Sequence, residues 1–191
     1  LSSRCARNTP VAVLMNPRSA ECVKVFFGVW AAGCFYAPLD PMLPPERLKL
    51  IMQNLEPTTI VYDEESRAKA DAVCPDGCEC VLWSDAAQSP VDADKLAQIR
   101  QTVTPDHLAA ILYTSGSTGI PKGVAHTQGS LMAYTEETIA RYQFTENTVF
   151  GNQSPFFYAN SIIDIFPLAL LGAKACMIPA TALSFPKTLV N

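Results

Sequence analysis

The sequence contains few charged residues, few basic residues and no long apolar run. Lys and Arg number 14 of 191 residues against 18 Asp and Glu, so the net charge is -4. This balance and the lack of a Lys/Arg cluster argue against nucleic acid as the main partner. The longest apolar stretch, residues 165–173, is far shorter than the ~20 residues of a membrane span. The first ten residues lack the apolar segment of a signal peptide, so we expect a cytoplasmic protein.

Cysteine is present, but its pattern is typical of neither a disulfide framework nor a zinc ribbon. The count is odd, and we expect reduced, mostly buried thiols, as in cytosolic proteins. The dense stretch CPDGCEC, residues 74–80, offers three thiolates, and a metal site there is the alternative interpretation. No second cysteine pair follows at zinc-ribbon spacing, so we expect no metal. The seven cysteines are Cys5, Cys22, Cys34, Cys74, Cys78, Cys80 and Cys176.

The apolar pattern of the first third alternates between strand and helix. Continuous apolar runs at residues 11–15, 34–40 and 58–63 have the length of buried strands. Apolar residues recur at helical spacing between these runs, at residues 20–31 and 48–55. Strands that alternate with helices pack as a parallel sheet covered on its faces. The sequence therefore predicts an α/β fold with a mostly parallel sheet flanked by helices.

In the remaining two thirds, the apolar pattern predicts secondary structure weakly up to residue 106 and clearly after it. Residues 64–106 are polar, with one short strand predicted at residues 80–83 and a surface loop at residues 87–96. Pro167 predicts a kink or a break in the helix at residues 160–171, because proline has no N–H to donate. The later predicted elements are strands at 107–114, 122–127, 148–153 and 173–179, and helices at 128–142 and 160–171.

A loop of unusual composition follows the strand predicted at residues 107–114. The chain has only nine glycines, and three of them fall in TSGSTGIPKG, residues 114–123. Glycines permit positive φ and let backbone N–H groups approach a ligand, hydroxyls suit phosphate oxygens, and Lys122 adds a cation. We expect a triphosphate-binding loop, with a flexible Ser/Gly surface turn as the alternative. A Walker A loop is disfavoured, because Lys122 follows Pro121 and precedes a glycine.

Three segments resemble adenylate-forming enzymes, the superfamily of acyl-CoA synthetases, luciferases and peptide-synthetase adenylation domains. Residues 113–131, YTSGSTGIPKGVAHTQGSL, resemble its phosphate-binding signature. Residues 30–52 resemble the second core motif of peptide-synthetase adenylation domains, and residues 154–179 resemble the helix that borders their substrate pocket. The resemblance implies that residues 1–191 are the front part of the large N-terminal (AMP-binding) domain. Residues 1–106 would hold the first βαβ units, and residues 107–191 the phosphate loop and the pocket border.

The activity that this resemblance implies is that of an AMP-forming acid–thiol ligase. A small carboxylic acid attacks the α-phosphate of ATP, and the acyl- or aminoacyl-adenylate passes to a thiol of CoA or of a carrier protein's phosphopantetheine. Mg²⁺ would bridge the phosphates. An acyl-CoA synthetase for a fatty or aryl acid, or a catalytically inactive nucleotide-binding module, is the alternative. The residues implied to hold the β- and γ-phosphates are Thr114, Ser115, Gly116, Ser117, Thr118, Gly119 and Lys122.

The substrate side departs from the pattern of amino-acid-activating members. Those members carry Phe-Asp-x-Ser, where the Asp pairs with the substrate ammonium, and this chain has Tyr158, Ala159, Asn160 and Ser161. Ala159 cannot form an ion pair, so we do not expect an ordinary α-amino acid. Asp164 is an alternative partner, but we expect a carboxylate on the helix surface. Tyr158 either gates the substrate carboxylate or packs in the core, and His126 is expected to pack beneath the loop.

The first prediction concerns the 191-residue chain by itself. It has no aromatic-Gly-x-Thr-Glu segment, no Tyr-Arg-Thr-Gly-Asp segment and no C-terminal domain with the catalytic lysine, so the catalytic residues are expected beyond residue 191. We predict that this chain alone does not catalyse ATP–pyrophosphate exchange. Isotope exchange measured with a panel of carboxylic acids tests this, and turnover that depends on Lys122 would contradict it.

Overall fold

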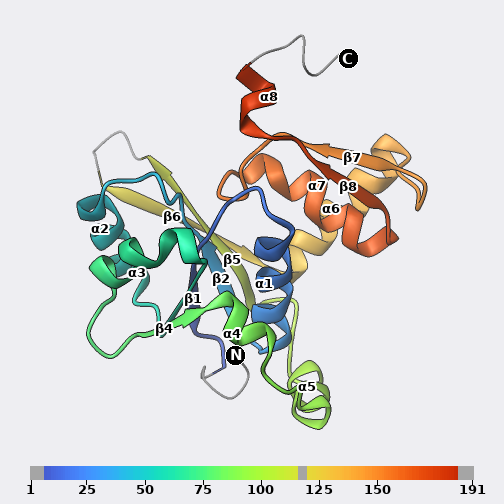
Figure 1. Ribbon diagram of the computed structural model, residues 1–191. Helices are drawn as coiled ribbons and strands as arrows, with labels where there is room; N and C mark the ends of the chain where they lie inside the picture. Colours follow the sequence, from blue (N-terminus) through green and yellow to red (C-terminus); the bar gives the residue numbers. More distant parts are fainter. Residues whose placement is uncertain (1–6, 116–119, 185–191) are drawn as a thin grey trace.

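The computed structural model describes residues 7–115 and 120–184, which contain a six-stranded sheet between two layers of helices (Figure 1). The strand order is β4-β3-β1-β2-β5-β6. Its four neighbouring pairs from β4 to β5 are parallel, and β5–β6 is antiparallel. The predicted α/β fold with a mostly parallel sheet is therefore confirmed. The strands are β1 (Pro10–Leu14), β2 (Phe35–Pro38), β3 (Thr59–Tyr62), β4 (Glu79–Leu82), β5 (Leu108–Ser115) and β6 (Pro121–Thr127).

Helices cover both faces of this sheet. Helices α1, α6 and α7 lie on one face, while α2 and α3 lie on the other. No described helix has both the length and the apolar character that crossing a membrane requires. The helices are α1 (Ala20–Ala31), α2 (Pro45–Leu55), α3 (Arg67–Val73), α4 (Trp83–Ala87), α5 (Ala93–Arg100), α6 (Gln128–Tyr142), α7 (Ile162–Leu171) and α8 (Ala180–Ser184), with 3₁₀ turns at Glu64–Ser66 and Ala159–Ser161.

The side-chain alternation of β1 explains the two layers. Val11 and Val13 pack into the core beneath α1, and Ala12 and Leu14 pack into the core beneath α2 and α3. All four are fully buried, as expected for a central strand of a parallel sheet. On the α1 face, the ring of Phe26 stacks on that of Tyr36 in β2, with 4.1 Å between the centroids. The two faces therefore hold separate apolar cores.

A second sheet, of two parallel strands, follows the six-stranded sheet along the chain. It pairs β7 (Val149–Asn152) with β8 (Lys174–Met177), and α7 connects the two strands (Figure 1). Helix α6 spans the predicted residues 128–142, and the side chain of Thr127 caps its first turn by accepting from the Ser130 N–H. The strand and helix types predicted after residue 106 are all present.

Two expectations differ from the structure. The surface loop predicted at residues 87–96 is wrong at its end, because α5 begins at Ala93, where the Asp92 side chain accepts from the Lys95 N–H. The thiols are not mostly buried: among the six described cysteines, only Cys22 and Cys34 are.

Helix α2 offers a matched test of its buried face. Leu48 is fully buried beneath the sheet, whereas Leu50 on the same helix is 47% exposed. Leu48→Ala is expected to lower the free energy of unfolding by about 3–5 kcal/mol, because it removes buried methyl groups and leaves a cavity. Leu50→Ala, the control, should cost less than about 1 kcal/mol. Equilibrium urea unfolding measures both, and equal losses would mean that the assigned face is wrong.

Candidate functional site

The candidate site lies where the parallel strands of the large sheet end. Ligands of open α/β sheets bind outside the carboxyl ends of the strands. Strands β2 and β5 are parallel neighbours, so the turn after β2 and the segment after β5 leave from the same edge. The segment after β5 is the predicted phosphate loop. Gly116, Ser117, Thr118 and Gly119 of that loop lie outside the described residues.

The two ends of the loop are held by the antiparallel pairing of β5 with β6. Thr114 lies opposite Lys122, and Ser115 lies opposite Pro121. The hydroxyl of Thr114 donates to the carbonyl oxygen of Lys122 at 3.4 Å. The Lys122 side chain is exposed, and its ammonium has no hydrogen-bond or ion-pair partner among the described residues. A loop with fixed ends and an exposed cation beside it suits an anionic ligand.

Glycine is required at position 123 for a different reason from the one expected. Positive φ was the expectation for all three loop glycines, but Gly123 is not among the described residues with positive φ. A Cβ at this position would lie 2.7 Å from Cγ2 of Ile111 and 3.3 Å from Cζ of Tyr113. Glycine is therefore needed for the close approach of β6 to β5. The Tyr113 hydroxyl also donates to Asn54 in α2 at 2.8 Å.

A cavity of about 370 Å³ is lined by residues from both the predicted phosphate loop and the predicted substrate segment. Thr114 and Pro121 line it from the ends of the loop, and Tyr158 and Ala159 line it from the opposite segment. Arg47 of α2 adds a guanidinium to the same wall. Lys122 is not among the described residues that line this cavity. The phosphate strand and the substrate segment, more than 40 residues apart in sequence, therefore meet at one place.

A turn fixed by Ser161 presents Tyr158 and Ala159 to this cavity. Ser161 is buried, and its hydroxyl donates to the carbonyl oxygen of Tyr158 at 2.7 Å. The backbone N–H of Ser161 donates to the same oxygen at 3.0 Å. The Tyr158 side chain is 59% exposed, so the alternative that it packs in the core is wrong. Ser161 therefore stabilises the turn and does not itself line the cavity.

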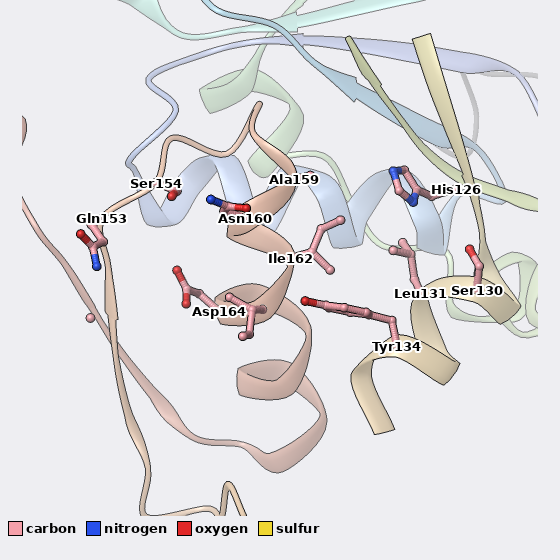
Figure 2. Close-up of a pocket in the computed structure, with 12 residues that line it drawn as sticks. His126, Ser130, Leu131, Tyr134, Gln153, Ser154, Ala159, Asn160, Ile162 and Asp164 are labelled. Atoms are coloured by element: carbon pink, nitrogen blue, oxygen red, sulfur yellow. The ribbon is translucent and has the colours of Figure 1, made fainter. Parts of the chain in front are cut away.

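A larger cavity of about 780 Å³ adjoins the first, and His126 and Ala159 line both (Figure 2). His126 is half-buried on β6, and its burial lowers the pKa of the imidazole, which favours the neutral ring. Tyr134 of α6 points across this cavity toward α7 in Figure 2, and the sequence patterns did not single it out. The described lining residues are His126, Ser130, Leu131, Tyr134, Gly151, Gln153, Ser154, Ala159, Asn160, Ile162, Ile163 and Asp164.

Asp164 corrects one expectation. The helix-surface carboxylate expected there is instead half-buried and lines the larger cavity, on the side of α7 that faces the end of β7 (Figure 2). It accepts a hydrogen bond of 2.8 Å from the side-chain amide of Asn152. Burial raises the pKa of this carboxyl, and the bond from Asn152 lowers it by less. Asn152 is itself buried, and its amide oxygen has no partner among the described residues.

Comparison with known proteins places the chain in a family. A family model described as "AMP-binding enzyme" matches residues 3–191. The chain is 30% identical over 188 residues to an L-proline–[L-prolyl-carrier protein] ligase of Pseudomonas fluorescens, which covers 94% of the chain and 37% of the ligase. It is 29% identical over 181 residues to the β-alanyl-bioamine nonribosomal peptide synthetase ebony of Drosophila melanogaster, covering 94% of the chain and 20% of ebony.

Solved structures agree with this assignment. A four-domain nonribosomal peptide synthetase, holo-AB3403 bound to AMP and glycine, is 26% identical with a TM-score of 0.78, covering 97% of the chain and 13% of that protein. McyG A-PCP complexed with phenylalanyl-adenylate has the same fold, with a TM-score of 0.83 at 20% identity, covering 98% and 31%. The chain belongs to the AMP-binding enzyme family, and it spans well under two thirds of the length of these relatives.

The raised pKa of Asp164 predicts a pH dependence of stability. The folded state binds the proton more tightly than the unfolded state, so this group favours folding most at low pH. Its contribution is lost as pH rises from about 3.9, the ordinary value of Asp, through the raised pKa. Asp164→Asn should therefore be more stable than the wild type at pH 7, by less than about 1 kcal/mol because the group is half-exposed.

Urea unfolding between pH 4 and pH 7 measures this difference. Asp94→Asn on the exposed side of α5 is the control, and its difference from the wild type should stay constant over the same range. A gap between wild type and Asp164→Asn that does not widen with pH would contradict the assigned burial.

Proposed function

We propose that the chain is the phosphate-binding and acid-binding front part of an ATP-dependent ligase. The ligase forms an acyl- or aminoacyl-adenylate and passes the acyl group to a thiol. The observation that carries this proposal is the meeting of Thr114 and Pro121 with Tyr158 and Ala159 in one cavity. Membership of the AMP-binding family supports it. Residues 1–106 contribute the first βαβ units, and residues 107–191 contribute the phosphate loop and the border of the acid pocket.

The loop from Thr114 to Lys122 binds the β- and γ-phosphates of ATP in this proposal. Pyrophosphate departs when the acid attacks the α-phosphate, and the departing group gains negative charge. A cation beside the loop stabilises that charge, and a cavity that excludes water strengthens the effect. The exposed ammonium of Lys122 and the hydroxyl of Thr114 supply these interactions, together with Ser115, Gly116, Ser117, Thr118 and Gly119.

The Mg²⁺ of this proposal would bridge phosphates of ATP, so the nucleotide would supply part of its coordination. Among the described residues, His, Cys, Asp and Glu side chains form no group of three or more that could hold a metal ion by itself.

A small carboxylic acid occupies the larger cavity, with its carboxylate near His126 and Ala159, where the two cavities adjoin. Ala159 provides no charge for an α-ammonium group, so we propose an acid without one or with its amino group farther from the carboxylate. Asp164 is the carboxylate that remains in this wall. The thiol acceptor is a carrier protein's phosphopantetheine, because the curated relatives include a carrier-protein ligase and a peptide synthetase. A cytoplasmic location belongs to the same proposal, since ATP and these thiols are available there.

Replacement of Lys122 tests the phosphate role in the full-length protein. Lys122→Ala should slow acid-dependent ATP–pyrophosphate exchange on the order of 10- to 100-fold, because a charge-assisted contact to the departing group is lost. Lys174→Ala removes a second exposed lysine, on β8, and should leave the exchange rate unchanged. Equal rates in wild type and Lys122→Ala, with both proteins folded by circular dichroism, would contradict the proposed role.

A further inference from the structure

The proposed function leaves one dense group of reactive side chains unexplained. Cys74 follows the last residue of α3, Cys78 lies in the next turn, and Cys80 lies in the edge strand β4, all on the α2 and α3 face of the sheet. They come from the stretch CPDGCEC and line neither cavity of the candidate site. All three are half-buried, so a small reagent has access to them.

A tight turn brings the first and last of these sulfur atoms into contact. The N–H of Cys78 donates to the carbonyl of Pro75 at 3.1 Å, and Gly77 within this turn has a φ of +79°. The turn reverses the chain so that Cys80 enters β4 beside Ile60 of β3. The thiol of Cys80 then donates to the sulfur of Cys74 at 2.8 Å. Strand pairing and the helix end hold both backbones, so the contact follows from the fold.

Cys78 takes a different position in the same turn. Its sulfur lies 4.0 Å from the carbonyl oxygen of Glu79, while the Cys74 thiol donates to the carbonyl oxygen of Cys78 at 3.4 Å. The three sulfurs therefore do not converge on one point, and among the described residues no group able to hold a metal ion is present. Geometry favours a pair, Cys74 with Cys80, over a three-thiolate metal site.

We propose that Cys74 and Cys80 are a reversible dithiol–disulfide pair that low-molecular-weight disulfides oxidise. One sulfur attacks the reagent RSSR as a thiolate, forms a mixed disulfide and releases one RSH after protonation. The second sulfur then attacks the first, and the second RSH leaves. Two protein thiols are oxidised to one disulfide, and one RSSR is reduced to two RSH, so the electrons and protons balance.

The surroundings of the pair give its two sulfurs different roles. Cys74 and Cys78 line an open cavity of about 750 Å³ between α2 and the turn, which gives a small disulfide access to Cys74. Burial and the bond to Cys74 raise the pKa of Cys80 to about 12, so Cys80 rests as a neutral thiol and must lose its proton before it attacks the mixed disulfide. In a cytosolic protein such a bond is transient, and it would tie the end of α3 to the edge strand β4.

Peptide mapping of the full-length protein after equilibration with oxidised glutathione tests the proposal. Cleavage before Asp76 separates Cys74 from Cys78, and cleavage after Glu79 separates Cys78 from Cys80, so a cross-link can be assigned to its two cysteines. We expect a Cys74–Cys80 link that dithiothreitol reverses. Alkylation of both residues in the oxidised protein should fall at least about tenfold, while exposed Cys176 stays reactive after brief reduction of surface mixed disulfides.

Two serine variants show which cysteines form the link. Cys78→Ser should retain the Cys74–Cys80 link, and Cys74→Ser should lose it. Three results would overturn the proposal: both thiols remain open to alkylation after equilibration, the link joins Cys78 instead, or stoichiometric Zn²⁺ protects all three cysteines equally from alkylation. The mapping of the wild-type protein decides these cases even if a variant fails to fold.

Discussion

The candidate site depends on one pairing, the antiparallel ladder between β5 and β6. Ala109, Ala110 and Leu112 bury β5 in the sheet, so one end of the phosphate loop is anchored in the core. The ladder then sets Thr114 against Lys122 at the other end. This approach needs glycine at position 123, because any Cβ there would collide with Ile111. Because both flanks are fixed by the ladder, the binding proposed for the loop between them would cost little conformational freedom in those flanks.

Aromatic packing connects this ladder to the helix that borders the acid cavity. The indole N–H of Trp30 in α1 donates to the carbonyl oxygen of Ala109 in β5 at 2.7 Å. The same ring stacks on Phe166 of α7, with 5.2 Å between the centroids. Phe156, which precedes the Tyr158 turn, contacts Phe26 of α1 edge to face. Helix α1 therefore contacts β5, α7 and the segment before the Tyr158 turn, which holds the two sides of the candidate site in register.

Periodicity predicted most of the fold. Apolar runs identified the buried strands because both faces of a parallel sheet are covered, and composition alone predicted the phosphate role of the loop. The half-buried position of Asp164 could not be predicted, because its surroundings include Asn152, which lies 12 residues earlier on β7. Glycine at position 123 was predicted to serve a positive φ, but the neighbouring strand β5 instead leaves no space for a side chain there. Tyr134 carried no signal, because a single aromatic on a helix has no local pattern. The phosphate and substrate roles assigned to residues 114–119, Lys122, Tyr158 and Ala159 remain predictions.

The strand order has a consequence for synthesis on the ribosome. Strands β4, β3, β1 and β2 are neighbours in the sheet, and all four lie within the first 82 residues. They can pair as soon as that stretch has emerged, whereas β5 begins at Leu108 and joins only at the open side of β2. Until β5 pairs with it, β2 is an edge strand, and its unpaired backbone N–H and C=O groups are open to pairing with another chain.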